Sequence, residues 1–191
     1  MEDFCQQPIY PLFEQIPFLE QRILYQECQK AHPQHRFHRL CISYFELPIC
    51  KFVTVLSQEE QTRILLHLKE REKTQHWMWW AFPQEQDSWT THRVSQRTKE
   101  YALTLEGAMR FLCVPSLLHY YKKAMEQIDH KVFRQKESLR IYFGPTDFLK
   151  FISHVHLFLR ASQRLHLHSL SSFLHKLQQI LEVSPSPSST T

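Results

Sequence analysis

The sequence predicts a mainly α-helical protein, and three observations support that prediction. Only two of the 191 residues are glycine, and the tight turns that join neighbouring strands of a sheet depend on glycine. Apolar residues recur three and four positions apart through the second half of the chain, which is the spacing of one helix face. Several of these runs begin at a serine or threonine that can cap a helix. We therefore expect a single compact helical domain with an irregular N-terminal extension.

The extension comprises residues 1–51 in this interpretation. Residues 1–50 hold five of the ten prolines and four of the five cysteines. Proline interrupts a helix because it lacks an amide hydrogen and clashes with the preceding turn, so only one helix is expected here, over Pro17 to Ala31. The helical domain follows over residues 52–183. Residues 184–191 (Ser-Pro-Ser-Pro-Ser-Ser-Thr-Thr) form a low-complexity tail that we expect to be disordered.

The first helix of the domain begins at a capping box. Ser57 is the expected N-cap and Glu60 the third helical residue. Ile64 and Leu68 then recur at helical spacing. The polar stretch 85–97 is expected to form a loop.

Two further helices are expected before the middle turn. The first covers residues 105–114, with Thr104 as its N-cap. The second covers residues 116–128, and Pro115 stands at its start, where the missing amide hydrogen costs nothing.

The chain turns once more before its last helices. Leu139 to Phe143 is expected to be extended or to form one helical turn, and Gly144-Pro145 is the strongest turn signal in the chain, with a glycine conformation that other residues do not tolerate. A helix should begin at Asp147, its N-cap, and run to about Arg160. The last helix carries a complete apolar stripe, Leu170, Phe173, Leu174, Leu177, Ile180 and Leu181.

Composition excludes several classes of protein. A formal net charge of +4 is too small to indicate a nucleic-acid partner. There is no run of 18 apolar residues, so no membrane span is expected. With two glycines the chain cannot form a glycine-rich phosphate loop, and no cofactor is expected. The scattered cysteines, without a CxxC pair, and an acidic N-terminus without an apolar signal segment indicate a reducing, cytoplasmic compartment.

The stretch from His76 to Gln84 is the most informative in the sequence, because it holds three of the four tryptophans. In an alternating pattern, Trp77 and Trp79 would share one face. The stretch is then either buried on both faces or lines a pocket, and we expect Trp77 and Trp79 to anchor the fold in both cases.

Two segments resemble the family known as domain of unknown function 1810, whose bacterial members are often mislabelled calpastatin. The first is Lys73-Thr74-Gln75-His76-Trp77-Met78-Trp79-Trp80-Ala81-Phe82-Pro83-Gln84, and the second is Phe143-Gly144-Pro145-Thr146-Asp147-Phe148-Leu149-Lys150-Phe151. The resemblance covers roughly residues 52–181 and implies a mainly helical fold, but no established reaction. Some polar positions depart from the family pattern, since Phe148 stands where the family has a second aspartate.

The two segments supply the candidate ligand-binding residues. His76 is either a base or stacking partner in an aromatic site, or a core histidine with satisfied nitrogens. Asp147 and Lys150 are three residues apart and should share one helix face. If one compact ligand is bound, the side chains of His76 and Lys150 should lie within about 12 Å of each other. The complete candidate set is His76, Trp77, Trp79, Gln84, Asp147 and Lys150; no catalytic residue is assigned.

No metal site is expected. Cys28, His32, His38 and Cys41 are the best zinc candidates in the sequence. Pro33 interrupts any helix through them, and their spacing matches no known finger, so incidental spacing is the preferred interpretation.

Two functions remain open at this stage, and the sequence does not decide whether the protein is an enzyme. The first is a non-enzymatic interaction protein, for instance a microbial effector secreted into a host cell, and the lost polar positions favour it. The second is a binding or hydrolytic protein for a planar, anionic, nucleotide-like ligand such as ADP-ribose, in a tryptophan-lined pocket. Convergence of His76, Asp147 and Lys150 on an open site would favour the second function, and tryptophans sealed in the core would favour the first.

Overall fold

The computed structural model describes residues 50–70, 73, 75–86 and 95–183. By its internal contacts the chain divides into two units, Met1–Cys50 and Lys51–Thr191, and all described residues except Cys50 belong to the second. The expected helix over Pro17 to Ala31, the Cys28/His32/His38/Cys41 set and the C-terminal tail lie outside the described residues.

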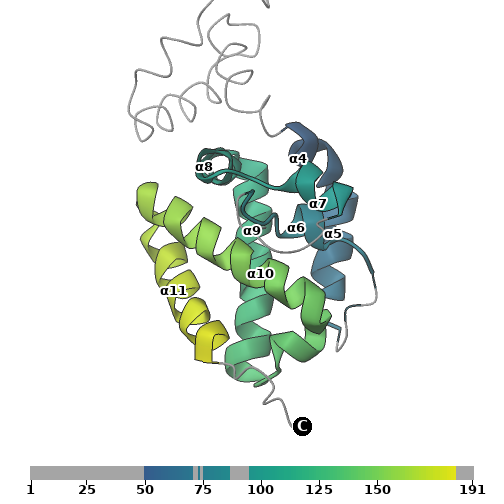
Figure 1. Cartoon of the computed structure of the whole chain (residues 1–191), viewed down its shortest axis with the longest axis vertical. Coiled ribbons are helices and arrows are strands. Elements are labelled where there is room, and N and C mark those ends of the chain that lie inside the picture. Colours follow the sequence, from purple (N-terminus) through teal and green to yellow (C-terminus); the bar gives the residue numbers. More distant parts are fainter. Residues whose placement is uncertain (1–49, 71–72, 74, 87–94, 184–191) are drawn as a thin grey trace, which may run out of the picture. The chain divides into compact units, whose positions relative to one another are not determined.

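The described residues form a helical structure, as the sequence predicts (Figure 1). One isolated parallel bridge, between Glu85 and Leu103, is the only β-pairing found in this part of the chain. Within it, no helix is both long and apolar enough to cross a bilayer. The helices are α4 (Cys50–Val55), α5 (Gln58–His67), α6 (Met78–Ala81), α7 (Gln96–Tyr101), α8 (Leu105–Cys113), α9 (Pro115–Asp129), the π-helical turn η3 (His130–Arg134), α10 (Leu139–Arg164) and α11 (His168–Val183).

The predicted caps are present at the starts of α5 and α8. The Ser57 hydroxyl accepts from the Glu60 amide at 3.3 Å, and the Thr104 hydroxyl accepts from the Gly107 amide at 3.1 Å. Each bond satisfies an amide that the first helical turn leaves without a partner. α9 begins at Pro115, also as expected.

The turn at Gly144 is a kink inside α10. Gly144 has φ 74° and ψ 164°, a region open essentially to glycine alone, as the sequence predicts. The preceding residues, Leu139 to Phe143, form the helical turn rather than an extended segment. The main part of α10 then passes in front of α9, and α11 packs along it (Figure 1).

The core between these helices is largely aromatic. Tyr121 of α9 lies against Phe158 of α10, with ring centroids 4.8 Å apart, and Phe82 meets Phe151 edge to face at 5.2 Å. Tyr121, Phe158, Phe82 and Phe151 are all fully buried or nearly so. Buried aromatic pairs of this kind add specific geometry to the burial of apolar area, so the segment that carries Phe82 is held firmly on α10.

Two parts of the prediction are wrong. The loop predicted over residues 85–97 ends too late, because Gln96 and Arg97 already belong to the helix α7, capped by the Ser95 hydroxyl. Met78–Ala81 form one helical turn, α6, so Trp77 and Trp79 do not share a face. Residues two apart on a helix point in nearly opposite directions, because each residue turns the chain by about 100°. Trp77 is fully buried, whereas Trp79 is partly exposed.

Candidate functional site

The two segments that resemble the family meet at an ion pair. The ammonium of Lys73 donates to Oδ2 of Asp147 at 2.6 Å, although 74 positions separate them in the sequence. The Lys73 amide also donates to the Tyr142 carbonyl at 3.3 Å. Because the kink at Gly144 starts the main part of α10, it brings Asp147 to the point where the chain enters the tryptophan stretch.

Asp147 also binds Lys150, one turn along α10, at 2.8 Å through Oδ1. The carboxylate therefore does not cap the helix, as the sequence suggested, but accepts from two ammonium groups. Burial raises its pKa, but the hydrogen bonds from Lys150 and Lys73 outweigh that effect and hold the pKa below the ordinary value. Asp147 is thus ionised and fixes the position of both lysines.

Trp79 is the centre of the candidate site. The Lys150 ammonium lies 5.1 Å from the centroid of the Trp79 ring, and the His76 ring is stacked on Trp79 with centroids 6.0 Å apart. The His76 ring and the Lys150 ammonium are therefore separated by at most the sum of these distances, 11.1 Å. This is within the reach of one compact ligand. His76 itself is exposed.

Arg97 is a member of this cluster that the sequence analysis missed. Its guanidinium lies 5.6 Å from the Trp79 centroid, within the range of cation–π attraction. Arg97 comes from α7, in a stretch expected to be a loop, and no spacing relates it to the other residues. Lys73, Lys150 and Arg97 are three cations and Asp147 is one carboxylate, so these four side chains together carry net positive charge.

Trp77 belongs to the core beneath the site. Its ring packs edge to face against Phe82 and Phe143, with centroids 6.0 and 6.4 Å away. The Lys73 ammonium also lies 5.2 Å from the centroid of the Trp77 ring. Trp77 therefore supports Lys73 from within and is sealed from solvent.

Three buried polar atoms of the stretch from His76 to Gln84 have no hydrogen-bond partner among the described residues. They are the indole nitrogens of Trp77 and Trp79 and the side-chain oxygen of Gln84. The Gln84 backbone is used, since its carbonyl accepts from the Leu103 amide at 2.9 Å. A buried polar atom without a partner costs about 1–3 kcal/mol, which a bound water or ligand atom would recover.

Trp80 is held by a separate polar group. Its indole nitrogen donates to Glu60 at 2.9 Å, and Arg63 donates to both oxygens of the same carboxylate at 2.7 and 2.6 Å. Burial raises the pKa of Glu60, but the hydrogen bonds from Arg63 and Trp80 lower it by a larger amount. The pKa of Glu60 therefore lies below its ordinary value. The Glu60 side chain therefore joins α5 to α6.

His154 is a buried polar residue whose structural role the sequence did not reveal. It is fully buried on α10, where its Nδ1 lies 2.9 Å from the Pro83 carbonyl. A carbonyl only accepts, so Nδ1 carries the hydrogen and Nε2 accepts from the Tyr121 hydroxyl at 3.0 Å. Burial lowers the pKa of His154 to about 3, against the opposing effect of the Pro83 bond. The neutral ring fixes the chain between Phe82 and Gln84.

Among the described residues no group of three or more histidine, cysteine, aspartate and glutamate side chains is arranged to hold a metal ion. The structure thus brings His76, Trp79, Asp147 and Lys150 together at one partly exposed cluster. The other two candidate residues, Trp77 and Gln84, are buried.

Comparison with known proteins gives two similarities. The model of DUF1810, a family described as proteins of unknown function, matches residues 47–182. A solved structure, the conserved hypothetical protein Rv1873 from Mycobacterium tuberculosis, is similar with a TM-score of 0.54 and 26% sequence identity, over 69% of this chain and 86% of that chain. No curated protein matches the chain.

Proposed function

The chain belongs to the DUF1810 family of proteins of unknown function, and we propose that it binds a planar, anionic small molecule at the cluster around Trp79. A nucleotide-like compound such as ADP-ribose fits this description. The observation that carries the proposal is the position of the Lys150 ammonium, fixed by Asp147 at 2.8 Å and held 5.1 Å from the Trp79 ring centroid.

The chemistry of the cluster supports such a ligand in two ways. Lys73, Lys150 and Arg97 exceed the charge of Asp147, which favours an anion such as a phosphate group. The stacked rings of His76 and Trp79 offer aromatic faces for a planar base. The indole nitrogen of Trp79, which has no partner among the described residues, is a further donor.

Binding alone is proposed, without a reaction. Both carboxylate oxygens of Asp147 already accept hydrogen bonds from lysines. A general base needs a free lone pair within reach of its proton, so Asp147 is a poor candidate for that role. His76, stacked on Trp79 with ring centroids 6.0 Å apart, is the other side chain of the cluster that could accept a proton.

The test is a titration of the full chain with adenosine, AMP, ADP and ADP-ribose, followed by calorimetry and by tryptophan fluorescence. Saturable binding is expected for the anionic compounds, with adenosine weaker by about tenfold or more because it lacks the phosphate. Lys150→Ala should weaken the binding of the anions and leave that of adenosine unchanged. Lys123→Ala, which removes an exposed lysine of α9, is the matched control and should have no effect.

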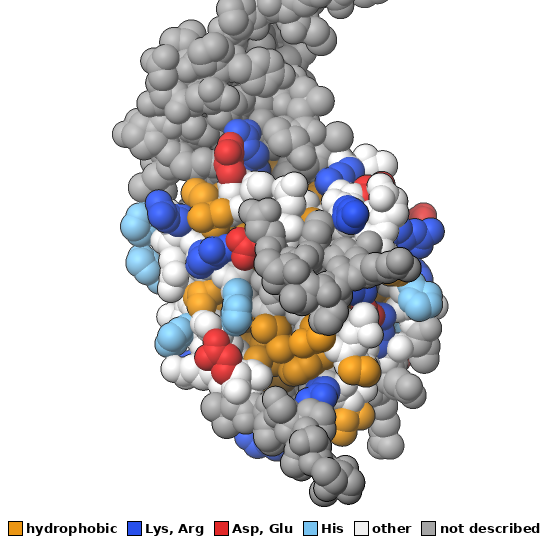
Figure 2. All heavy atoms as spheres, viewed as in Figure 1, with side chains coloured by type: hydrophobic (Ala, Val, Ile, Leu, Met, Phe, Trp, Pro, Cys, Tyr) orange, Lys and Arg blue, Asp and Glu red, His pale blue; other side chains and the backbone are white. Residues whose placement is uncertain are grey.

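A different observation favours a second function, the non-enzymatic interaction protein. Ile141 and Leu149 of α10 are 82% and 63% exposed. In Figure 2 hydrophobic side chains gather below the centre of the described surface, among charged side chains of both signs. If no compound in the panel binds saturably, the ligand proposal is rejected and an interaction role, such as that of an effector, becomes the better account.

A further inference from the structure

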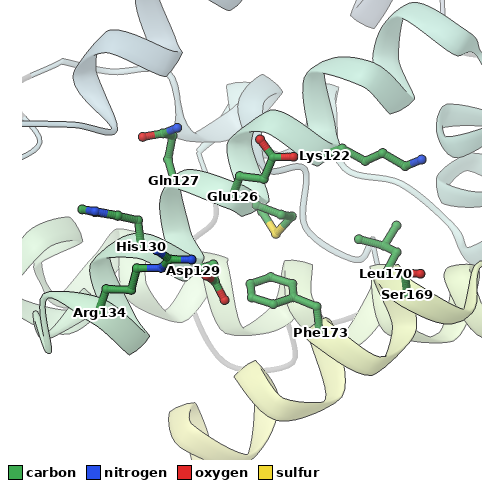
Figure 3. A pocket seen from close by; sticks show the side chains of 10 residues that line it. Lys122, Glu126, Gln127, Asp129, His130, Arg134, Ser169, Leu170 and Phe173 are labelled. Atoms are coloured by element: carbon green, nitrogen blue, oxygen red, sulfur yellow. The ribbon is translucent and has the colours of Figure 1, made fainter.

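A cavity of about 540 Å³ lies between α9, η3 and α11, lined by residues that the Trp79 cluster does not use (Figure 3). Cavities of roughly 300–1,000 Å³ are typical of small-molecule sites. Its floor is apolar. Met125 and Leu170 are buried, and the ring of Phe173 points from α11 into the space toward α9.

The rim of the cavity is charged, with both signs equally represented. Lys122 and Arg134 supply two cations, and Glu126 and Asp129 supply two carboxylates. Throughout the described part of the chain none of these four side chains forms an ion pair or a hydrogen bond. Four charges around one apolar floor are therefore available to a ligand.

The π-helical turn accounts for the position of Arg134. Lys131, the second residue of the turn, is buried, whereas Arg134, its last residue, lines the cavity. Lys131 is held there by the Glu137 carboxylate at 2.9 Å and lies 4.4 Å from the Tyr142 ring centroid. Turns of this kind are rare and occur frequently at functional sites.

We propose that this cavity binds a small apolar zwitterion, of the class of hydrophobic amino acids and dipeptides. The apolar floor requires an apolar group. A simple carboxylate would be attracted by Arg134 but repelled by Glu126 and Asp129. An organic cation would be attracted by these two carboxylates but repelled by Lys122 and Arg134. A zwitterion satisfies both signs at once, with its carboxylate at Arg134 and its ammonium at Asp129, while its side chain lies on Phe173.

The experiment uses the full chain and three forms of one dipeptide, followed by calorimetry. Phe-Leu carries both charges, acetyl-Phe-Leu lacks the ammonium, and Phe-Leu amide lacks the carboxylate. Phe-Leu should bind at least about tenfold more tightly than either blocked form, since each block leaves a charge of the rim unpaired. Equal binding of the three forms, or binding of none, would overturn the proposal.

Variants assign the two ends of the ligand. Arg134→Gln should lower the affinity for Phe-Leu to that for Phe-Leu amide, and should leave the affinity for the amide unchanged. Asp129→Asn should remove the preference for Phe-Leu over its acetylated form. Lys123→Gln, an exposed change on α9 outside the cavity lining, is the control and should leave all three affinities unchanged. If Arg134→Gln and Asp129→Asn both bind as the wild type does, the charges of the rim do not recognise the ligand and the proposal fails.

Discussion

The Lys73 ammonium donates to the Asp147 carboxylate at 2.6 Å, and this ion pair joins the segment before the tryptophans to the start of the main part of α10. Only 5% of the Lys73 side chain and 17% of the Asp147 side chain are exposed. Asp147 in turn orients Lys150, so one pair organises both the fold and the candidate site.

Removal of this carboxylate should lower stability in a pH-dependent way. The folded-state pKa of Asp147 lies below its ordinary value, so its contribution is present above the unfolded-state pKa and is lost as the pH falls through the folded-state pKa. Asp147→Asn should cost about 1–3 kcal/mol of unfolding free energy at pH 7. The difference from wild type should shrink below about pH 4.

Urea unfolding of both proteins between pH 3 and pH 7 would measure this. Glu59→Gln, an exposed change on α5, is the control. Its unfolding free energy should depend on pH as that of the wild type does. A constant difference between Asp147→Asn and wild type at every pH would mean that the charge of the Asp147 carboxylate is not the source of the lost stability.

The tryptophans should differ sharply in their effect on stability. Trp77 is fully buried against Phe82 and Phe143, so Trp77→Ala should cost about 3–5 kcal/mol. The sequence predicts Trp79 as a second anchor of the fold, but its side chain is partly exposed, so Trp79→Ala should cost only about 1 kcal/mol. Denaturant unfolding of the two variants decides the matter, and equal losses would contradict the division between core and site.

His154 should make the protein less stable below neutral pH. Its pKa is about 3 in the folded state and 6.5 in the reference state, so the unfolded chain binds more protons between these values. Stability therefore rises with pH in this window and falls as the pH drops from 6.5. The loss from this residue approaches about 1.4 kcal/mol per pH unit.

His154→Gln is the test of that dependence, because glutamine keeps a donor and an acceptor but does not titrate. Between pH 6.5 and 5, where carboxylates contribute little, the slope of unfolding free energy against pH should decrease in this variant. His119→Gln, an exposed change on α9, should keep the slope of the wild type. An unchanged slope in His154→Gln would show that the buried ring does not control it.

Gly144→Ala should destabilise the protein through the backbone alone. A Cβ atom at this position would meet nothing within 4 Å, yet φ is 74°. The expected cost is about 1–3 kcal/mol, the strain of a residue other than glycine in this region. At Gly107 the limit is space rather than backbone conformation. A Cβ atom there would lie 3.0 Å from the Leu103 side chain, whereas the φ of Gly107 is not positive. Thermal unfolding of Gly144→Ala at the wild-type midpoint would contradict the argument.

The sequence by itself determined the features that depend on neighbouring residues. The Ser57 and Thr104 caps, the start of α9 at Pro115, the kink at Gly144 and the shared face of Asp147 and Lys150 all follow from spacings of a few positions. Local hydrogen bonds and backbone sterics act over that range, so they are visible in the sequence.

Only the tertiary structure decided which residues that are distant in the sequence contact each other. Nothing in the spacing pairs Lys73 with Asp147, brings Arg97 to Trp79, or buries His154 between Tyr121 and Pro83. The helical turn α6, which separates Trp77 from Trp79, forms where alternation suggested one shared face. These contacts depend on how the kinked α10 packs on α8, α9 and α6, and packing selects partners by shape and by the need to satisfy buried polar groups, which no local pattern encodes.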